Sequence, residues 1–166
     1  MPTRRANQRR SRPRPGIGGS WEEPGFRGYA LPVLQNGRWA LFAALILGVL
    51  WAFWHLPFFI TGVDHWNESV QLIAWTVAFA WLFNNTQGSV LLAMLMHAMN
   101  NTISSYFGPM FSGADSVRQG WFYAALWCAV AVVLIVVYGP QHLSRTHHKQ
   151  EDPVQPEGST ASPRVV

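Results

Sequence analysis

"WALFAALILGVLWAFWHLPFFI", residues Trp39–Ile60, is an apolar run that contains one titratable side chain, His55. A helix of this length crosses the ~30 Å hydrocarbon core of a bilayer. Because a titratable residue inside a span is costly, His55 is a candidate functional residue by default. The run therefore predicts a transmembrane helix that carries part of a site.

Three further apolar segments follow this run along the chain: Val70–Phe83, Ser89–Phe107 and Trp121–Tyr138. The first of them is short for a span, and it also fits an interfacial or re-entrant segment. Only 12% of the residues are charged, against about a quarter in soluble proteins. These observations predict an all-α integral membrane bundle of about four transmembrane helices, with membrane lipid around it.

The positive charges lie toward the two ends of the chain. Half of the twelve basic residues fall between Arg4 and Arg14, and Arg145 and Lys149 follow the last apolar segment. The loop 61–69 has no Lys or Arg. By the positive-inside rule, both termini are expected on the cytoplasmic side, at the plasma membrane if the protein is bacterial. This topology signal accounts for the basic residues, so no nucleic-acid partner is expected.

Composition divides the chain into three parts. Residues 1–19 are rich in Arg, and residues 141–166 are rich in Gln, Pro, Ser and Glu. Both segments are expected to be disordered tails, because they offer little apolar surface to bury. Residues 20–140 hold the apolar segments and form the expected membrane core.

Two histidines and an asparagine lie on small-residue faces of the predicted spans. In the first span, His55 follows a stripe with a spacing of four: Ala40, Ala44, Gly48 and Ala52. In the third, the spacing is the same: Ser89, Ala93, His97, Asn101 and Ser105. Such stripes let helices approach closely, so His55, His97 and Asn101 are expected to face packed protein. Each side chain alone could be an interhelical contact worth ~0.6 kcal/mol, but their joint occurrence favours a site.

Two adjacent carboxylates, Glu22 and Glu23, precede the first span on what is predicted to be a separate helix. Glu23 and Arg27 are four residues apart and can pair on one helix face, which leaves Glu22 free to point elsewhere. One interpretation is a solvated, capped helix at the membrane interface. The functional hypothesis is that Glu22 faces the histidines and acts as a general base on water.

Three short motifs occur in order along the chain. They are EExxxR in "EEPGFR" (Glu22–Arg27), an FxxxH-like motif in "WAFWH" (Trp51–His55) and HxxxN in "HAMNN" (His97–Asn101). Together they resemble the CPBP family of intramembrane proteases, also called CAAX proteases or Abi proteins. The sequence departs from the family pattern at Trp51, where Phe is usual, and this change is expected to affect mainly packing.

The resemblance implies hydrolysis of a peptide bond within or near the membrane. In that mechanism Glu22 and His97 activate a water molecule, and His55 and Asn101 stabilise the oxyanion. Glutamate would be essential, and no covalent intermediate would form. The expected substrate is a membrane-associated protein or peptide, prenylated or not.

In the same resemblance, Glu23 and Arg27 support the site without touching the substrate. No cofactor is expected. Zn²⁺ held by the two glutamates and two histidines is an alternative, although the sequence has no HExxH motif.

Family members usually have several membrane helices before the EExxxR motif. The chain is therefore expected to correspond to the C-terminal core of such a protease, with a partner as one source of the missing helices. The alternative function is a non-catalytic or truncated CPBP-like membrane protein that acts in bacteriocin immunity or as a scaffold.

Overall fold

The computed structural model describes residues 18–145, and this part is built from helices without strands. A nearly continuous helical segment comes first, made of η1 (Gly18–Glu22), α1 (Glu23–Gly25), η2 (Phe26–Ala30) and α2 (Leu31–Gln35). The remaining elements are α3 (Ala40–Trp54), α4 (Leu56–Ile60), α5 (Asn67–Asn85), α6 (Val90–Phe107), η3 (Gly108–Met110) and α7 (Ala114–Tyr138). The all-α prediction is confirmed.

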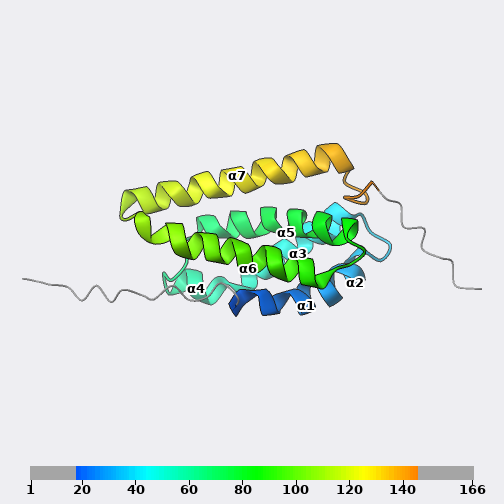
Figure 1. Cartoon of the computed structure of the whole chain (residues 1–166), viewed down its shortest axis with the longest axis horizontal. Helices are drawn as coiled ribbons and strands as arrows, with labels where there is room; N and C mark the ends of the chain where they lie inside the picture. Colours follow the sequence, from blue (N-terminus) through cyan, green and yellow to red (C-terminus); the bar gives the residue numbers. More distant parts are fainter. Residues whose placement is uncertain (1–17, 146–166) are drawn as a thin grey trace, which may run out of the picture.

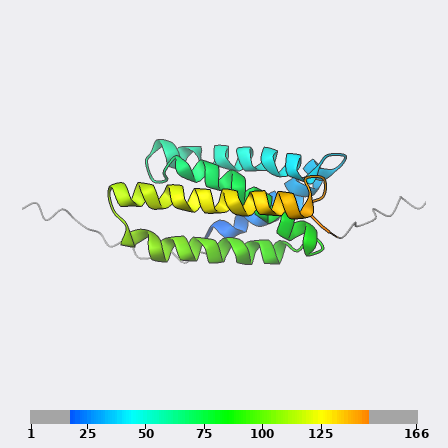
Figure 2. The ribbon, with the colours of Figure 1, turned by 90° about the horizontal axis from the view of Figure 1, so that it is seen from above.

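Helix α5 is the centre of the bundle. It packs against α3 on one side and α7 on the other, and more lightly against α6. The four long helices run in roughly the same direction as the long axis of the molecule (Figures 1 and 2). The N-terminal helical segment crosses beside α6, which it contacts through η1, α1 and η2. This contact brings the EExxxR motif next to the HxxxN motif.

The predicted span Trp39–Ile60 is broken in the structure. Helix α3 ends at Trp54 and α4 starts at Leu56, with His55 between them. Pro57 accounts for the break, because it has no N–H to donate and its ring clashes with the carbonyl of the residue four positions earlier. His55 therefore sits at a helix end rather than inside a continuous span.

The segment predicted as Val70–Phe83 is longer in the structure. Helix α5 has 19 residues, which correspond to about 28 Å at 1.5 Å per residue. Its first turns contain Asn67 and Gln71, which are buried between helices. A reading of apolar residues alone misses these turns, because the buried polar residues interrupt the apolar run.

The small-residue stripe of α3 is where α3 and α5 meet. Ala40 and Ala44 are buried, and a methyl carbon on Gly48 would lie 2.9 Å from Cα of Ile73 and 3.2 Å from the Thr76 hydroxyl. Contact this close leaves no room for a side chain. The expected close helix approach is confirmed.

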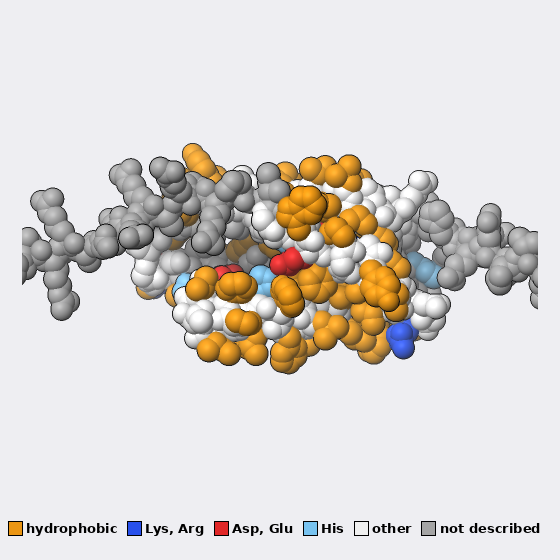
Figure 3. Space-filling view, turned by 90° about the horizontal axis from the view of Figure 1, so that it is seen from below, with side chains coloured by type: hydrophobic (Ala, Val, Ile, Leu, Met, Phe, Trp, Pro, Cys, Tyr) orange, Lys and Arg blue, Asp and Glu red, His pale blue; other side chains and the backbone are white. Residues whose placement is uncertain are grey.

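In residues 18–145, α7 alone is long and apolar enough to cross a membrane, and α3 is apolar but shorter. The break at His55 shortens α3, and the polar residues of α5 and α6 lower their apolar character. Many large apolar side chains are exposed, and apolar side chains are spread over the face seen in Figure 3. Length and composition thus support one of the four predicted spans, α7, and the other three stay a prediction.

The ends of the described part pack onto the bundle. Gly18 and Gly19 already belong to η1. At the other end Leu143 is buried, and its carbonyl accepts a hydrogen bond from the amide of Asn85 at 2.8 Å. These residues lie next to the predicted core of residues 20–140, and the rest of the predicted tails lies outside the described residues.

We expect Gly48→Val to lower the free energy of unfolding by about 1–3 kcal/mol, because the added side chain forces α3 away from α5. Gly25 is the matched control, since it is helical and has open space around it. Gly25→Ala is expected to leave stability unchanged or slightly higher. Thermal unfolding in detergent compares the two variants, and equal melting temperatures would contradict the close approach.

Candidate active site

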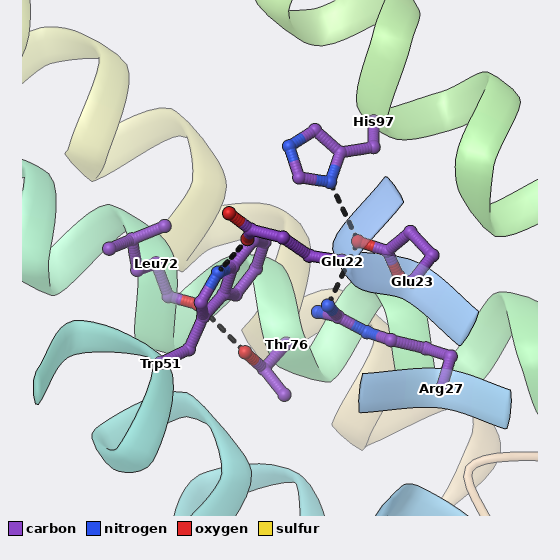
Figure 4. Close-up of polar contacts among 7 residues, drawn as sticks. All are labelled: Glu22, Glu23, Arg27, Trp51, Leu72, Thr76 and His97. Atoms are coloured by element: carbon purple, nitrogen blue, oxygen red, sulfur yellow. Dashed lines mark hydrogen bonds and ion pairs between the residues drawn. The ribbon is translucent and has the colours of Figure 1, made fainter. Parts of the chain in front are cut away.

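A buried ion pair joins the N-terminal helical segment to α6. Glu23 and Arg27 are both fully buried, with 3.0 Å between Oε1 of Glu23 and Nη1 of Arg27. The same Oε1 lies 2.7 Å from Nδ1 of His97 (Figure 4). An ionised carboxylate only accepts hydrogen bonds, so Nδ1 of His97 is the donor. In the neutral ring this leaves Nε2 as an acceptor, which is the form that can take a proton from water.

The guanidinium of Arg27 is surrounded by aromatic rings. Its Cζ lies 4.4 Å from the centroid of the Trp51 ring and 4.1 Å from that of Phe79. Burial lowers the pKa of Arg27 to about 10, while the charges of Glu23 and Glu22 act to raise it. The group stays protonated at neutral pH, so the pairing of Glu23 with Arg27 expected from their spacing is a buried ion pair.

Glu22 has a different partner from its neighbour. Its Oε2 accepts a hydrogen bond of 2.7 Å from the indole nitrogen of Trp51, and the side chain is half-buried. The carboxylate that contacts His97 directly is thus Glu23, and the predicted action of Glu22 and His97 on one water molecule stays a prediction. Trp51 lies between Glu22 and His97, because it donates to Glu22 and its ring centroid lies 5.5 Å from that of the His97 ring.

The side chains of His97 and Asn101 both lie beside Gly19, in η1 at the start of the described chain. A methyl carbon placed on Gly19 would lie 2.8 Å from Nε2 of His97 and 2.9 Å from Nδ2 of Asn101. Both atoms therefore border the same small volume, which the backbone of Gly19 covers. The HxxxN spacing places these side chains one helical turn apart on α6, as predicted.

His55 lies at the edge of this group. Its ring packs against Trp51 at 6.2 Å between centroids, and its Nδ1 lies 3.4 Å from Oδ2 of Asp64. Both side chains are 24% exposed. The partner of His55 is thus Asp64 of the α4–α5 loop and not Asn101.

Sequence reasoning missed three contributors to this region. Trp51 was read as a packing change, yet it donates to Glu22. Asp64 belongs to no motif. Asn100 is buried and accepts a hydrogen bond from the Tyr123 hydroxyl, which ties α6 to α7. Of these three, only Asp64 could have been noticed in the sequence, because it is a titratable residue in the loop that follows His55.

Part of the site reaches the surface, since the side chains of His55 and Asp64 are each 24% exposed. Figure 3 shows acidic and histidine side chains near one another among apolar ones. A separate surface hollow, lined by residues that include Asn36, Trp39, Gln87 and His142, contains none of the motif residues. The motif residues Glu22, Arg27 and His97 instead surround Trp51.

The metal alternative depends on whether the two glutamates and two histidines converge. Within residues 18–145, no three side chains of His, Cys, Asp or Glu are grouped so as to hold a metal ion. Each histidine of the motifs directs Nδ1 to a different carboxylate, Glu23 for His97 and Asp64 for His55. This geometry does not form the four-ligand set considered from the sequence.

Comparison with known proteins agrees with the motifs. The model of the type II CAAX prenyl endopeptidase Rce1-like family matches residues 16–103, which is more than half of the 166-residue chain and includes all three motifs. The chain belongs to this family. CAAX proteases are membrane-embedded, and membership supports a protease function in general. The predicted resemblance to the CPBP or CAAX proteases is confirmed.

One curated relative of this CAAX protease family member is CAAX prenyl protease 2 of Methanococcus maripaludis, which is 29% identical over 98 residues. The match covers 51% of this chain and 36% of the relative. The chain therefore corresponds to about a third of that protein's length. No solved structure gives a significant match.

We expect Arg27→Met to destabilise the protein by about 3–5 kcal/mol, because it leaves the buried carboxylate of Glu23 without its cation. The double variant that combines Arg27→Met with Glu23→Gln has no buried carboxylate charge and should recover much of the lost stability. The matched control is Arg118→Met, since the Arg118 pair with Asp115 is on the surface and is worth less than ~1 kcal/mol. Chemical unfolding measures all three, and equal losses in the single and double variants would contradict a buried ion pair.

Proposed function

We propose that this protein is a glutamate-dependent intramembrane endopeptidase that hydrolyses a peptide bond of a membrane-associated protein or peptide. The observation that carries the proposal is the contact between the buried Glu23 carboxylate and Nδ1 of His97. It fixes the ring so that Nε2 borders the same volume as the Asn101 amide. A carboxylate–histidine pair beside an amide donor is suited to activating water and binding an oxyanion.

In the proposed first step, Glu22 and His97 hold the attacking water. The free nitrogen of His97 and the carboxylate of Glu22 are both turned away from Arg27 (Figure 4). Glu22 accepts a proton as the water oxygen bonds to the carbonyl carbon, and Nε2 of His97 accepts the second hydrogen bond of the water. The proton then passes to the leaving amine as the C–N bond breaks. Water is the only co-reactant.

Asn101 and His55 are the proposed donors to the oxyanion, each worth about 3 kcal/mol. Asn101 donates from Nδ2. His55 would donate from Nε2, because its Nδ1 lies 3.4 Å from Oδ2 of Asp64.

We further propose that α3 with α4, α5, α6 and α7 lie in the membrane, with both termini on the cytoplasmic side, at the plasma membrane in a bacterium. The exposed apolar side chains and the long apolar α7 support this arrangement. Lipid covers the outer faces in this proposal. Because the match covers about a third of the relative, a partner is a possible source of additional helices.

The first substrate to test is a farnesylated peptide with a C-terminal CAAX sequence, because the matched relative is named a CAAX prenyl protease. We expect Glu22→Gln to lower the cleavage rate by about 10²–10⁴-fold. The glutamine oxygen still accepts the Trp51 hydrogen bond, so folding and membrane insertion should be retained. Asp115→Asn, at an exposed carboxylate, is the matched control.

Unchanged cleavage by Glu22→Gln would overturn the assignment of Glu22 as the base. Lack of cleavage by the wild-type protein, across prenylated and unprenylated membrane peptides, would favour the immunity or scaffold alternative.

Cleavage is also expected to persist in excess EDTA, because the proposed mechanism uses a carboxylate and an imidazole in place of a metal ion. The assay compares rates before and after dialysis against the chelator. Loss of activity with recovery on addition of Zn²⁺ would reverse this expectation.

A further inference from the structure

We propose that Trp51 is a positioning residue, which holds the carboxylate of Glu22 through its indole N–H in the orientation needed to act on water. This inference rests on the proposed role of Glu22 as the base. The bond joins Nε1 of Trp51 to Oε2 of Glu22 at 2.7 Å. A hydrogen bond to an ionised carboxylate is short and roughly twice as strong as one between neutral groups.

The direction of this N–H is fixed by packing. Trp51 is 1% exposed, and its ring contacts Phe26, Trp75 and Phe79 with centroid distances of 5.7, 6.1 and 6.0 Å. The guanidinium of Arg27 lies over its face at 4.4 Å. A ring enclosed in this way cannot rotate without displacing its neighbours. Trp51 therefore presents its donor to Glu22 in one geometry.

The same ring sets the position of Glu22 relative to His97. Trp51 contacts the His97 ring edge-on, with 5.5 Å between centroids, while its N–H binds one oxygen of Glu22. Within residues 18–145, the other oxygen of Glu22 has no hydrogen-bond partner, and in the proposed function it faces the water molecule. Trp51, a rigid side chain of α3, therefore fixes the position of the Glu22 carboxylate relative to the His97 imidazole.

Other tryptophans show that this contact is not a general property of the core. The indole nitrogens of Trp75, Trp81 and Trp127 are buried without a hydrogen-bond partner in the described part of the chain. Trp75 also packs on His97, at 6.2 Å between ring centroids. It therefore resembles Trp51 in burial and in aromatic contacts but has no bond to Glu22. Trp75→Phe is the matched control for Trp51→Phe.

Both variants are made in the full chain and assayed for cleavage of the farnesylated CAAX peptide in proteoliposomes. Trp51→Phe keeps an aromatic ring and removes the donor. We expect its kcat to fall by about tenfold or more with KM little changed, because an interaction with the base acts on the chemical step. Trp75→Phe is expected to change kcat by less than about threefold, since it breaks no bond to Glu22.

A second readout does not depend on activity. In ¹⁵N–¹H spectra of the indole groups, the signal lost in Trp51→Phe identifies Trp51. That signal is expected to move in Glu22→Gln, where a neutral amide replaces the carboxylate acceptor, and to stay in place in Asp115→Asn.

The outcomes separate this inference from the proposed function. Glu22→Gln inactive with Trp51→Phe at wild-type kcat would overturn the positioning role and leave the base assignment standing. Glu22→Gln fully active would overturn the proposed function. If Glu22→Gln moved no indole signal at all, the contact itself would be overturned, even if Trp51→Phe failed to fold.

Discussion

The arrangement depends on one interaction, the fully buried ion pair between Glu23 and Arg27. Taking both charges out of water costs more than their attraction returns unless other polar contacts are added. Here His97 provides a second hydrogen bond to the carboxylate, and the rings of Trp51 and Phe79 lie over the guanidinium. The N-terminal segment is consequently fixed to both α3 and α6. Removing any one of these groups would leave a buried charge poorly compensated.

The motifs and most helices could be predicted from the sequence, because apolar runs and four-residue spacings are local properties. The pairing of Glu23 with Arg27 also follows from their spacing, but which of the two adjacent glutamates contacts His97 could not be predicted. Glu22 and Glu23 differ by about 100° around a regular helix, and this segment passes from 3-10 to α to π geometry. Which carboxylate reaches His97 is therefore set by the packing of the segment on α6. The start of α5 could not be predicted either, because Asn67 and Gln71 are polar and resemble loop residues in a hydropathy profile, although packing buries them.

Two contacts of the site join residues that no helical periodicity relates. Glu22 and Trp51 are 29 residues apart, so the sequence does not predict their hydrogen bond. The replacement of Phe by Trp in a motif also suggests only a change of side-chain volume. Asp64 is nine residues from His55, on the far side of a proline break that the sequence did contain. Trp51 is a departure from the family residue at a motif position, and Asp64 lies outside the motifs. Family motifs located the site, and the particular partners of each motif residue came from the three-dimensional packing.

Gly19 covers one side of the site. Its backbone lies against Nε2 of His97 and the amide of Asn101 with no side chain between them. In the proposed function, a water molecule at Nε2 and a carbonyl oxygen at the Asn101 amide would compete with the η1 turn for this space. Peptide binding would then be a displacement equilibrium, in which the affinity is reduced by the free energy that holds η1 against α6.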